Sequence, residues 1–303
     1  MDSKQIEAAS YDRVAAEFDV HAQRWGLPFA EKLCALAGIG PGDQVLDVGA
    51  GTGLAARAAA RMVGGGGKIL AVDLAEGMLA VGEARGRKEG LVPHILRFQV
   101  MDAEHLDLPD NSVDVAISLY AFLHFSDPAA AVSELGRVLR PGGRLCIGVG
   151  SGPPLHSARG GWFQARRAVD RAANLLGRRA EMPSQILGLL DAHLPPVSAR
   201  GTEGSAGVGR RPGPALDRML RAAGFEHLRH SWRGVIDEID DPEEFWSLQA
   251  SLCSEARYRI QQSPPEAVER LHAAVVAASW RVLDRGGKLI YPHGAWYVTG
   301  RAS

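Results

Sequence analysis

Three glycines spaced two apart and one acidic residue stand together in the stretch VLDVGAGTGL, residues 45–54. A glycine turn between a strand and a helix lets backbone N–H groups approach a ligand closely. Dinucleotide-binding turns need the spacing G-x-G-x-x-G, but the place of the third glycine is taken by Leu54. Asp47, two residues before Gly49, also suits a ligand with a positively charged amino group. The stretch therefore favours a ligand with a cationic end over a dinucleotide.

Two further carboxylates follow the next two predicted strands. Asp73 ends a strand predicted at 68–73, where it can accept hydrogen bonds from both hydroxyl groups of a ribose. Asp102 follows a strand predicted at 96–101, where it can accept from an adenine amino group. The carboxyl ends of parallel strands form the edge where open α/β sheets bind ligands. Because a charge-assisted hydrogen bond contributes about 1.5–3 kcal/mol, losing Asp73 is expected to weaken binding more than losing one glycine contact.

The first half of the chain alternates between strand-like and helix-like segments, which predicts a parallel sheet with helices on both faces. The strand-like segments are continuous apolar runs, as expected for strands buried on both faces. They are residues 44–49, 68–73, 96–101, 113–119 and 144–150.

One predicted helix, between the last two of these strands, has clear start and stop signals. Asp127 is a suitable N-cap, and Pro128 occupies the first helical position. An apolar face of Val132, Leu135 and Leu139 then precedes the sequence PGG, which is expected to end the helix.

The second half of the chain interrupts the alternation twice. The first interruption contains an arginine-rich stretch and then a glycine- and serine-rich one at 198–214, which predicts a mobile loop. The second predicts one helix from Asp241 and another from Ser263 and Glu266, which have capping-box spacing. A helix near 214–223 and strands near 227–236 and 288–301 resume the α/β pattern.

We therefore expect a single α/β domain over residues 1–303, with an N-terminal helical cap and two helical lid insertions. The expected core is residues 28–150, 213–236 and 287–301, the cap is 1–27, and the lid insertions are 151–212 and 237–286.

Composition narrows the class of protein. A formal net charge of −1 gives no general attraction to nucleic acid or to an anionic membrane. No apolar run reaches the roughly 18 residues of a spanning helix, and the N-terminus lacks the features of a secretory signal. Three distant cysteines indicate neither a disulfide framework nor a zinc site, and the acidic run at 236–244 has no histidine at ligand spacing. We expect a cytoplasmic protein with no metal, no nucleic-acid partner and no stable membrane insertion, compatible with a homodimer.

Four segments together resemble successive motifs of class I S-adenosylmethionine-dependent methyltransferases. They are VLDVGAGTG, VDLAEGML, MDAEHLDLPDNSVDVAISLYAFLHF and VLRPGGRLCI. The resemblance is strongest to the small-molecule group that includes ubiquinone/menaquinone-type C-methyltransferases, and it covers about residues 40–150. It implies a Rossmann-like seven-stranded sheet whose last strand is antiparallel. It also implies S-adenosyl-L-methionine as the cofactor and methyl transfer to an O, N or C atom of a small organic acceptor.

The same resemblance implies which residues hold the cofactor. Asp47 and the glycines would flank its methionine part, Asp73 would hold the ribose, and Asp102 would read the adenine edge. Tyr11 is similar in position to a tyrosine that closes over the cofactor in such enzymes, with ordinary helix packing as the alternative. The implied set is Tyr11, Asp47, Gly49, Ala50, Gly51, Gly53, Asp73, Leu74, Met78, Asp102, Ala103, Ser118 and Leu119.

Methyl transfer from a sulfonium is an in-line displacement, for which a protein mainly aligns the reactants and excludes water. Such positioning can lower the barrier by about 7–11 kcal/mol. A general base adds about 10²–10⁴-fold, and only where the nucleophile must lose a proton as it reacts. Candidates for that base are His124, His293 and Tyr291, and a structural role is the alternative for each.

Three other functions stay open. The near-neutral charge, and SLYA at 118–121 in place of an NPPY-like motif, argue against a protein or RNA methyltransferase. Leu54 and the acid at Asp102 argue against a nicotinamide oxidoreductase. Nothing in the sequence excludes an S-adenosylmethionine-binding protein without turnover.

Overall fold

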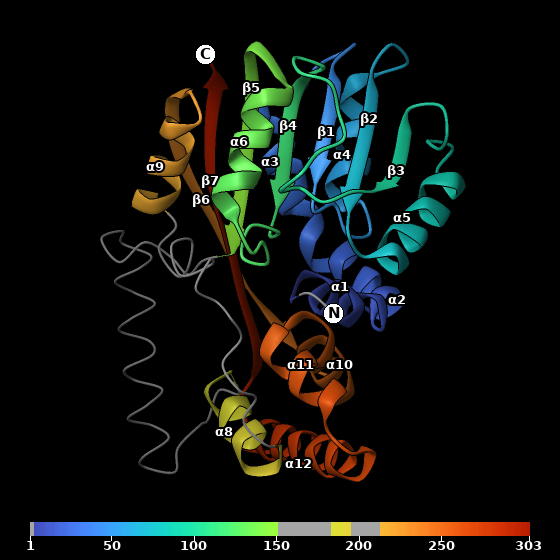
Figure 1. Ribbon diagram of the computed structural model, residues 1–303. Helices are drawn as coiled ribbons and strands as arrows, with labels where there is room; N and C mark the ends of the chain where they lie inside the picture. The colour runs from blue at the N-terminus through green and yellow to red at the C-terminus, as the bar shows by residue number, and fades with distance from the viewer. Residues whose placement is uncertain (1–2, 151–182, 195–212) are drawn as a thin grey trace. The chain divides into compact units, whose positions relative to one another are not determined.

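A computed structural model describes residues 3–150, 183–194 and 213–303 (Figure 1). The chain forms two compact units. The first consists of Met1–Ser151, Gly201–Arg233 and Ala295–Ser303, and the second of Gly152–Arg200 and Gly234–Gly294. The bounds of the second unit differ from those of the predicted insertions, since residues 201–212 fall in the first unit and residues 234–236 and 287–294 fall in the second.

The first unit contains a seven-stranded sheet with the strand order β3-β2-β1-β4-β5-β7-β6. Strands β1 to β5 pair in parallel, and β7 runs antiparallel to β5. The predicted sheet with an antiparallel last strand is confirmed. The strands are β1 (Gln44–Val48), β2 (Lys68–Asp73), β3 (Leu96–Val100), β4 (Val113–Leu119), β5 (Leu139–Gly150), β6 (Phe225–Ile239) and β7 (Leu289–Ala302).

Helices cover both faces of this sheet (Figure 1). The described helices of the first unit are α1 (Ser3–Asp12), α2 (Ala15–His21), the π-helix η1 (Ala22–Gly26), α3 (Leu27–Ala37), α4 (Leu54–Val63), α5 (Glu76–Lys88), α6 (Pro128–Val138) and α9 (Gly213–Ala222). On one face, Leu46 of β1 belongs to the same buried cluster as Leu135 of α6 and Leu220 of α9. On the other face α3 packs against α4, where the Cys34 thiol lies 3.6 Å from the carbonyl oxygen of Ala55. The central strands are therefore buried on both sides, which explains their continuous apolar runs.

Helix α6 begins as predicted but ends earlier. The Asp127 side chain accepts two hydrogen bonds of 3.0 Å from backbone N–H groups of the first turn. The helix ends at Val138, because Leu139 has extended dihedrals (φ −71°, ψ 138°) and pairs with Val113 of β4. The prediction that Leu139 continues the helix face and that PGG ends the helix was wrong. Leu139 is instead the first residue of β5, and the sequence PGG lies within that strand.

The described part of the second unit consists of helices, together with residues 234–239 of β6 and 289–294 of β7. Its described helices are α8 (Pro183–His193), α10 (Pro242–Leu252), α11 (Ser254–Gln262) and α12 (Pro265–Asp284). Arg259 of α11, whose side chain is only 4% exposed, lies 2.7 Å from Asp191 of α8. It also donates to the carbonyl oxygens of Leu190 and Leu194, at 2.8 and 2.5 Å. One buried guanidinium thus binds two carbonyl oxygens at the C-terminal end of α8.

The predicted starts of the helices in this unit met different outcomes. Asp241 caps α10 as predicted, since its side chain accepts from the backbone N–H of Glu243 at 2.9 Å. The capping box predicted for the last helix was wrong, because the Ser263 hydroxyl donates back to the carbonyl oxygen of Arg259 at 2.8 Å. Pro264 occupies the N-cap position of α12 instead. Helix α11, which the sequence did not predict, ends directly before this turn.

The mobile loop predicted at 198–214 lies almost entirely outside the described residues, as does most of the arginine-rich stretch before it. Among the helices that are described, none is long and apolar enough to cross a membrane. In the same parts of the chain, no group of three or more His, Cys, Asp or Glu side chains is placed to hold a metal ion.

Candidate functional site

A cavity of about 140 Å³ lies in the first unit, where the chain leaves the carboxyl ends of β1, β2, β3 and β4. Side chains of α1 contribute to its wall. The cavity brings together most of the residues that the sequence predicts for a ligand site. These are Tyr11, Gly49, Gly51, Asp73, Leu74, Met78, Asp102, Ala103, Leu119 and His124.

The other predicted residues do not line this cavity. Asp47 lies in β1, and Ala50 and Gly53 lie in the loop after it. The structure does not bring Ser118 to the wall, because its buried hydroxyl donates to the carbonyl oxygen of Val48 at 2.9 Å. The predicted contacts of these four residues with a ligand stay predictions.

Tyr291 and His293 belong to the second unit. Their rings stack with centroids 4.9 Å apart, and His293 Nε2 lies 3.6 Å from an Asp237 carboxylate oxygen. Burial raises the pKa of the Tyr291 hydroxyl. A catalytic role for either residue stays a prediction.

The glycine loop brings backbone to the cavity wall where no side chain would fit. Gly49 and Gly51 have positive φ angles of 67° and 54°, a region that side-chain-bearing residues rarely adopt. A Cβ atom at Gly49 would lie only 2.2 Å from the Cβ atom of Ala121. Both glycines are therefore required by conformation, and Gly49 is also required by its close approach to the loop after β4.

Asp73 ties the second strand to the glycine loop. One of its carboxylate oxygens accepts from the backbone N–H of Gly51 at 2.8 Å, and the other accepts from that of Ala75 at 3.0 Å. Burial raises the pKa of this carboxyl group, and these backbone hydrogen bonds oppose the increase. The carboxylate is thus held in one orientation at the cavity wall, with lone pairs left for a ligand.

Asp47 is a buried carboxyl group with little support from the protein. Its side chain is 1% exposed, and neither of its oxygens has a well-formed hydrogen bond among the described residues. Burial raises its pKa from the ordinary 3.8 to about 8, and the nearby Asp73 adds to the increase. The backbone N–H of Ala56 offsets only part of it. A buried carboxyl group in this state is suited to a cationic partner.

Asp102 is joined to the N-terminal helix by a cation that the sequence analysis did not single out. Lys4 Nζ of α1 lies 2.8 Å from Asp102 Oδ2 and 2.5 Å from Glu104 Oε2. Asp102 Oδ1 accepts from the backbone N–H of Glu104 at 2.9 Å. Lys4 and Glu104 both line the cavity, so its wall beside Asp102 carries two carboxylates and one ammonium group.

Helix α1 presents one face to the cavity, formed by Lys4, Glu7, Ala8 and Tyr11. Their spacing of three or four residues is the helical repeat, and it was the only sequence signal that could have found Lys4 and Glu7. Asp12, the last residue of α1, accepts from the backbone N–H of Gly77 at 2.7 Å, in the first turn of α5. Contacts near both ends therefore hold α1 against the site.

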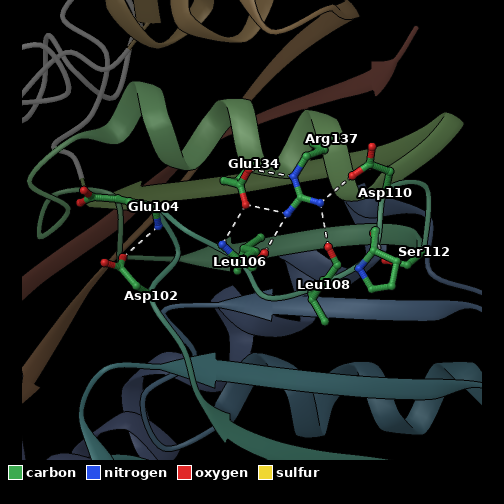
Figure 2. A network of polar contacts seen from close by, with 9 residues as sticks. Asp102, Glu104, Leu106, Leu108, Asp110, Ser112, Glu134 and Arg137 are labelled. Carbon is green, nitrogen blue, oxygen red and sulfur yellow. Dashed lines mark hydrogen bonds and ion pairs between the residues drawn. The ribbon is translucent and has the colours of Figure 1, made fainter.

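Arg137 of α6 holds the loop that follows Asp102 (Figure 2). Its guanidinium donates to the carbonyl oxygens of Leu106 and Leu108, at 2.8 and 2.7 Å. It also donates to Asp110 at 2.7 Å and to both carboxylate oxygens of Glu134, at 2.8 and 2.7 Å. Glu134 in turn accepts from the backbone N–H of Leu106 at 2.8 Å, and its hydrogen bonds to Arg137 lower its pKa. One side chain thus fixes the loop between β3 and β4.

Replacing Arg137 by lysine is expected to lower the free energy of unfolding by about 2–3 kcal/mol, because an ammonium cannot reproduce this forked set of charge-assisted hydrogen bonds. Chemical denaturation measures the change. The control is Arg87→Lys, whose exposed pair with Glu83 (2.6 Å) is expected to contribute less than about 0.5 kcal/mol. Equal stability losses in the two variants would contradict the assigned role of Arg137.

Comparison with known proteins identifies the family of the part that forms this site. Residues 46–147 match the family described as "Methyltransferase domain". The chain is also 33% identical over 141 residues to the ubiquinone/menaquinone biosynthesis C-methyltransferase UbiE of Hydrogenovibrio crunogenus. This alignment covers 45% of this chain and 55% of that protein. The chain carries a class I S-adenosylmethionine-dependent methyltransferase domain. The matched residues of this methyltransferase domain run from β1 into β5 and include the glycine loop, Asp73 and Asp102.

Solved structures share the fold of the chain that carries the methyltransferase domain. The YcgJ protein of Bacillus subtilis superposes with a TM-score of 0.53 at 20% identity, covering 90% of this chain and 97% of that one. A protein of Galdieria sulphuraria gives 0.51 at 19% identity, covering 93% and 87%. These likenesses show the fold alone. The aligned part of the chain spans about half the length of the UbiE relative.

Proposed function

We propose that this protein transfers the methyl group of S-adenosylmethionine to an O, N or C atom of a small organic acceptor. The observation that carries the proposal is that one cavity gathers the glycine loop and the carboxylates that end or follow two neighbouring strands. The likeness to a C-methyltransferase of quinone biosynthesis supports a small acceptor.

The residues at the cavity fit an adenosyl cofactor with a cationic end. The buried Asp47 carboxyl group lacks a well-formed partner in the described structure and would stabilise a positively charged amino group. Gly49 and Gly51 line the cavity and would present their backbone to the ligand there. Asp73 would accept from the ribose hydroxyls, and Asp102 would accept from the adenine amino group beside Lys4.

The contribution of the chain to the reaction is mainly positioning. When bound, S-adenosylmethionine supplies a methyl group that a sulfonium makes electrophilic. Met78, Met101 and Phe125 line the cavity and make part of its wall apolar. Holding the acceptor in line can supply about 7–11 kcal/mol of barrier lowering.

Calorimetric titration tests the cofactor, and a screen of acceptors tests the reaction. We expect S-adenosylmethionine to bind with a micromolar dissociation constant, about −8 kcal/mol, and NADH to give no heat. We also expect S-adenosylhomocysteine to be released when a small acceptor is supplied. Binding without release with any small acceptor, protein or RNA would favour a non-catalytic binding protein, and release with protein or RNA alone would overturn the small-acceptor proposal.

A further inference from the structure

Helix α1 places two polar side chains against the ring of His124. Glu7 and Tyr11 are four residues apart on one helix face, and all three side chains line the cavity. Glu7 Oε1 lies 3.1 Å from His124 Nδ1, and Tyr11 Oη lies 3.0 Å from His124 Nε2. The Glu7 and His124 side chains are only 16% and 24% exposed. A carboxylate, an imidazole and a phenol therefore form a continuous chain at the cavity wall.

The chemistry of these three groups fixes the direction of the hydrogen bonds between them. An ionised carboxylate can only accept hydrogen bonds, so the proton of a neutral His124 ring lies on Nδ1, beside Glu7. Nε2 then carries a lone pair, and the Tyr11 hydroxyl donates to it. The Tyr11 oxygen keeps lone pairs that can accept a proton from a molecule in the cavity. Protons are thus directed from the cavity toward His124.

We propose that Tyr11, His124 and Glu7 form a proton relay that deprotonates the methyl acceptor, with Glu7 as the positioning residue for His124. This proposal rests on the proposed function. It extends the prediction that His124 is a general base, because it assigns proton acceptance from the acceptor to Tyr11. It also gives Tyr11 a role beyond the predicted contact with the cofactor.

The proposed step moves one proton and one methyl group. The bond between the acceptor atom and its hydrogen breaks, and the proton passes to Tyr11 Oη while the Tyr11 proton passes to His124 Nε2. The freed electron pair bonds to the methyl carbon, and the pair of the broken carbon–sulfur bond stays on sulfur. The positive charge lost by the sulfonium is thereby matched by the imidazolium of His124, which Glu7 neutralises. An acceptor served by this relay carries a dissociable proton on the reacting atom, unlike a thioether or a tertiary amine.

The tautomer of His124 tests the relay without any turnover. We expect ¹⁵N NMR of the protein without added ligand to show the proton of the neutral ring on Nδ1, with the signals assigned by comparison with His124→Asn. Glu7→Gln is expected to remove this preference, because an amide can present either its oxygen or its NH₂ group to Nδ1. Glu17→Gln, on the exposed face of α2, is the matched control and is expected to keep the wild-type tautomer. A wild-type proton on Nε2, or an unchanged tautomer in Glu7→Gln, would overturn the proposal.

Kinetics separates proton transfer from binding. With an acceptor found in the screen, Tyr11→Phe is expected to lower kcat by about 10²–10⁴-fold, and Glu7→Gln by at least about 10-fold. The dissociation constant of S-adenosylhomocysteine is expected to change by less than about 3-fold in both variants. Unchanged kcat in Tyr11→Phe would overturn the relay while the proposed function stands. Failure of the wild type to bind S-adenosylmethionine would overturn the proposed function, and the tautomer would still decide the hydrogen-bonded chain.

Discussion

Replacing Asp73 by asparagine is expected to weaken the binding of S-adenosylhomocysteine by about 10²–10⁴-fold. The carboxylate would accept two charge-assisted hydrogen bonds from the ribose, each contributing about 1.5–3 kcal/mol. An amide offers only one acceptor oxygen and no charge. That oxygen is also needed by the backbone N–H groups of Gly51 and Ala75, which the wild-type carboxylate satisfies at 2.8 and 3.0 Å. Calorimetric titration of the variant measures the loss.

Glu76→Gln is the matched control for this experiment. This substitution removes the same charge as Asp73→Asn, three residues further along the chain. Glu76 is exposed and does not line the cavity. Its dissociation constant is expected to stay within about 2-fold of the wild type. Thermal melting of both variants shows whether the Asp73 variant has lost only its ligand contact. Wild-type affinity in a folded Asp73→Asn protein would contradict the ribose assignment.

Asp47 is expected to make the stability of the protein fall as the pH rises from about 4 to about 8. Its pKa is about 8 in the folded protein and near 3.8 in the unfolded chain, so the folded state holds a proton that the unfolded state releases in this interval. The free energy of unfolding therefore decreases with pH and loses about 5 kcal/mol across the interval from this group. The Asp47→Asn variant cannot ionise and is expected to lack this part of the decrease.

Urea denaturation between pH 4 and pH 8 measures both slopes. Glu31→Gln, at an exposed position of α3, is expected to keep the wild-type slope. Parallel curves for the wild type and Asp47→Asn would show that the buried carboxyl group is already ionised near pH 4. Asp47→Asn is also expected to bind S-adenosylmethionine more weakly, since an amide cannot ionise to pair with the cationic end of the ligand.

Strands and helix starts that depend only on neighbouring residues in the sequence could be predicted closely. The strands at 68–73 and 113–119 match the observed β2 and β4, because a short apolar run between turn residues has few alternatives in an α/β fold. Asp127 and Asp241 were predictable as N-caps, because a cap needs only a side chain and the next few N–H groups. The glycine loop and the two acids at strand ends were also predictable, because the carboxyl ends of parallel strands meet at one edge of the sheet.

Features that depend on distant contacts could not be predicted. Lys4 meets Asp102 across 98 positions, and nothing in the residues around Lys4 indicates that encounter. The start of β5 at Leu139 was missed because an apolar residue fits a helix face and a strand equally well, and only the pairing with Val113 decides. The capping box at Ser263 failed because the hydroxyl found a carbonyl acceptor one turn back in α11. Side-chain hydroxyl groups have several local partners, so spacing alone does not choose among them.

A crystal structure of the protein with bound S-adenosylhomocysteine tests the central claim most directly. We expect the adenosyl group in the cavity of the first unit, with both ribose hydroxyls within hydrogen-bonding distance of Asp73 and the adenine amino group at Asp102. The ligand amino group is expected near Asp47. An adenosyl group bound at other residues, with this cavity left without it, would contradict the assignment.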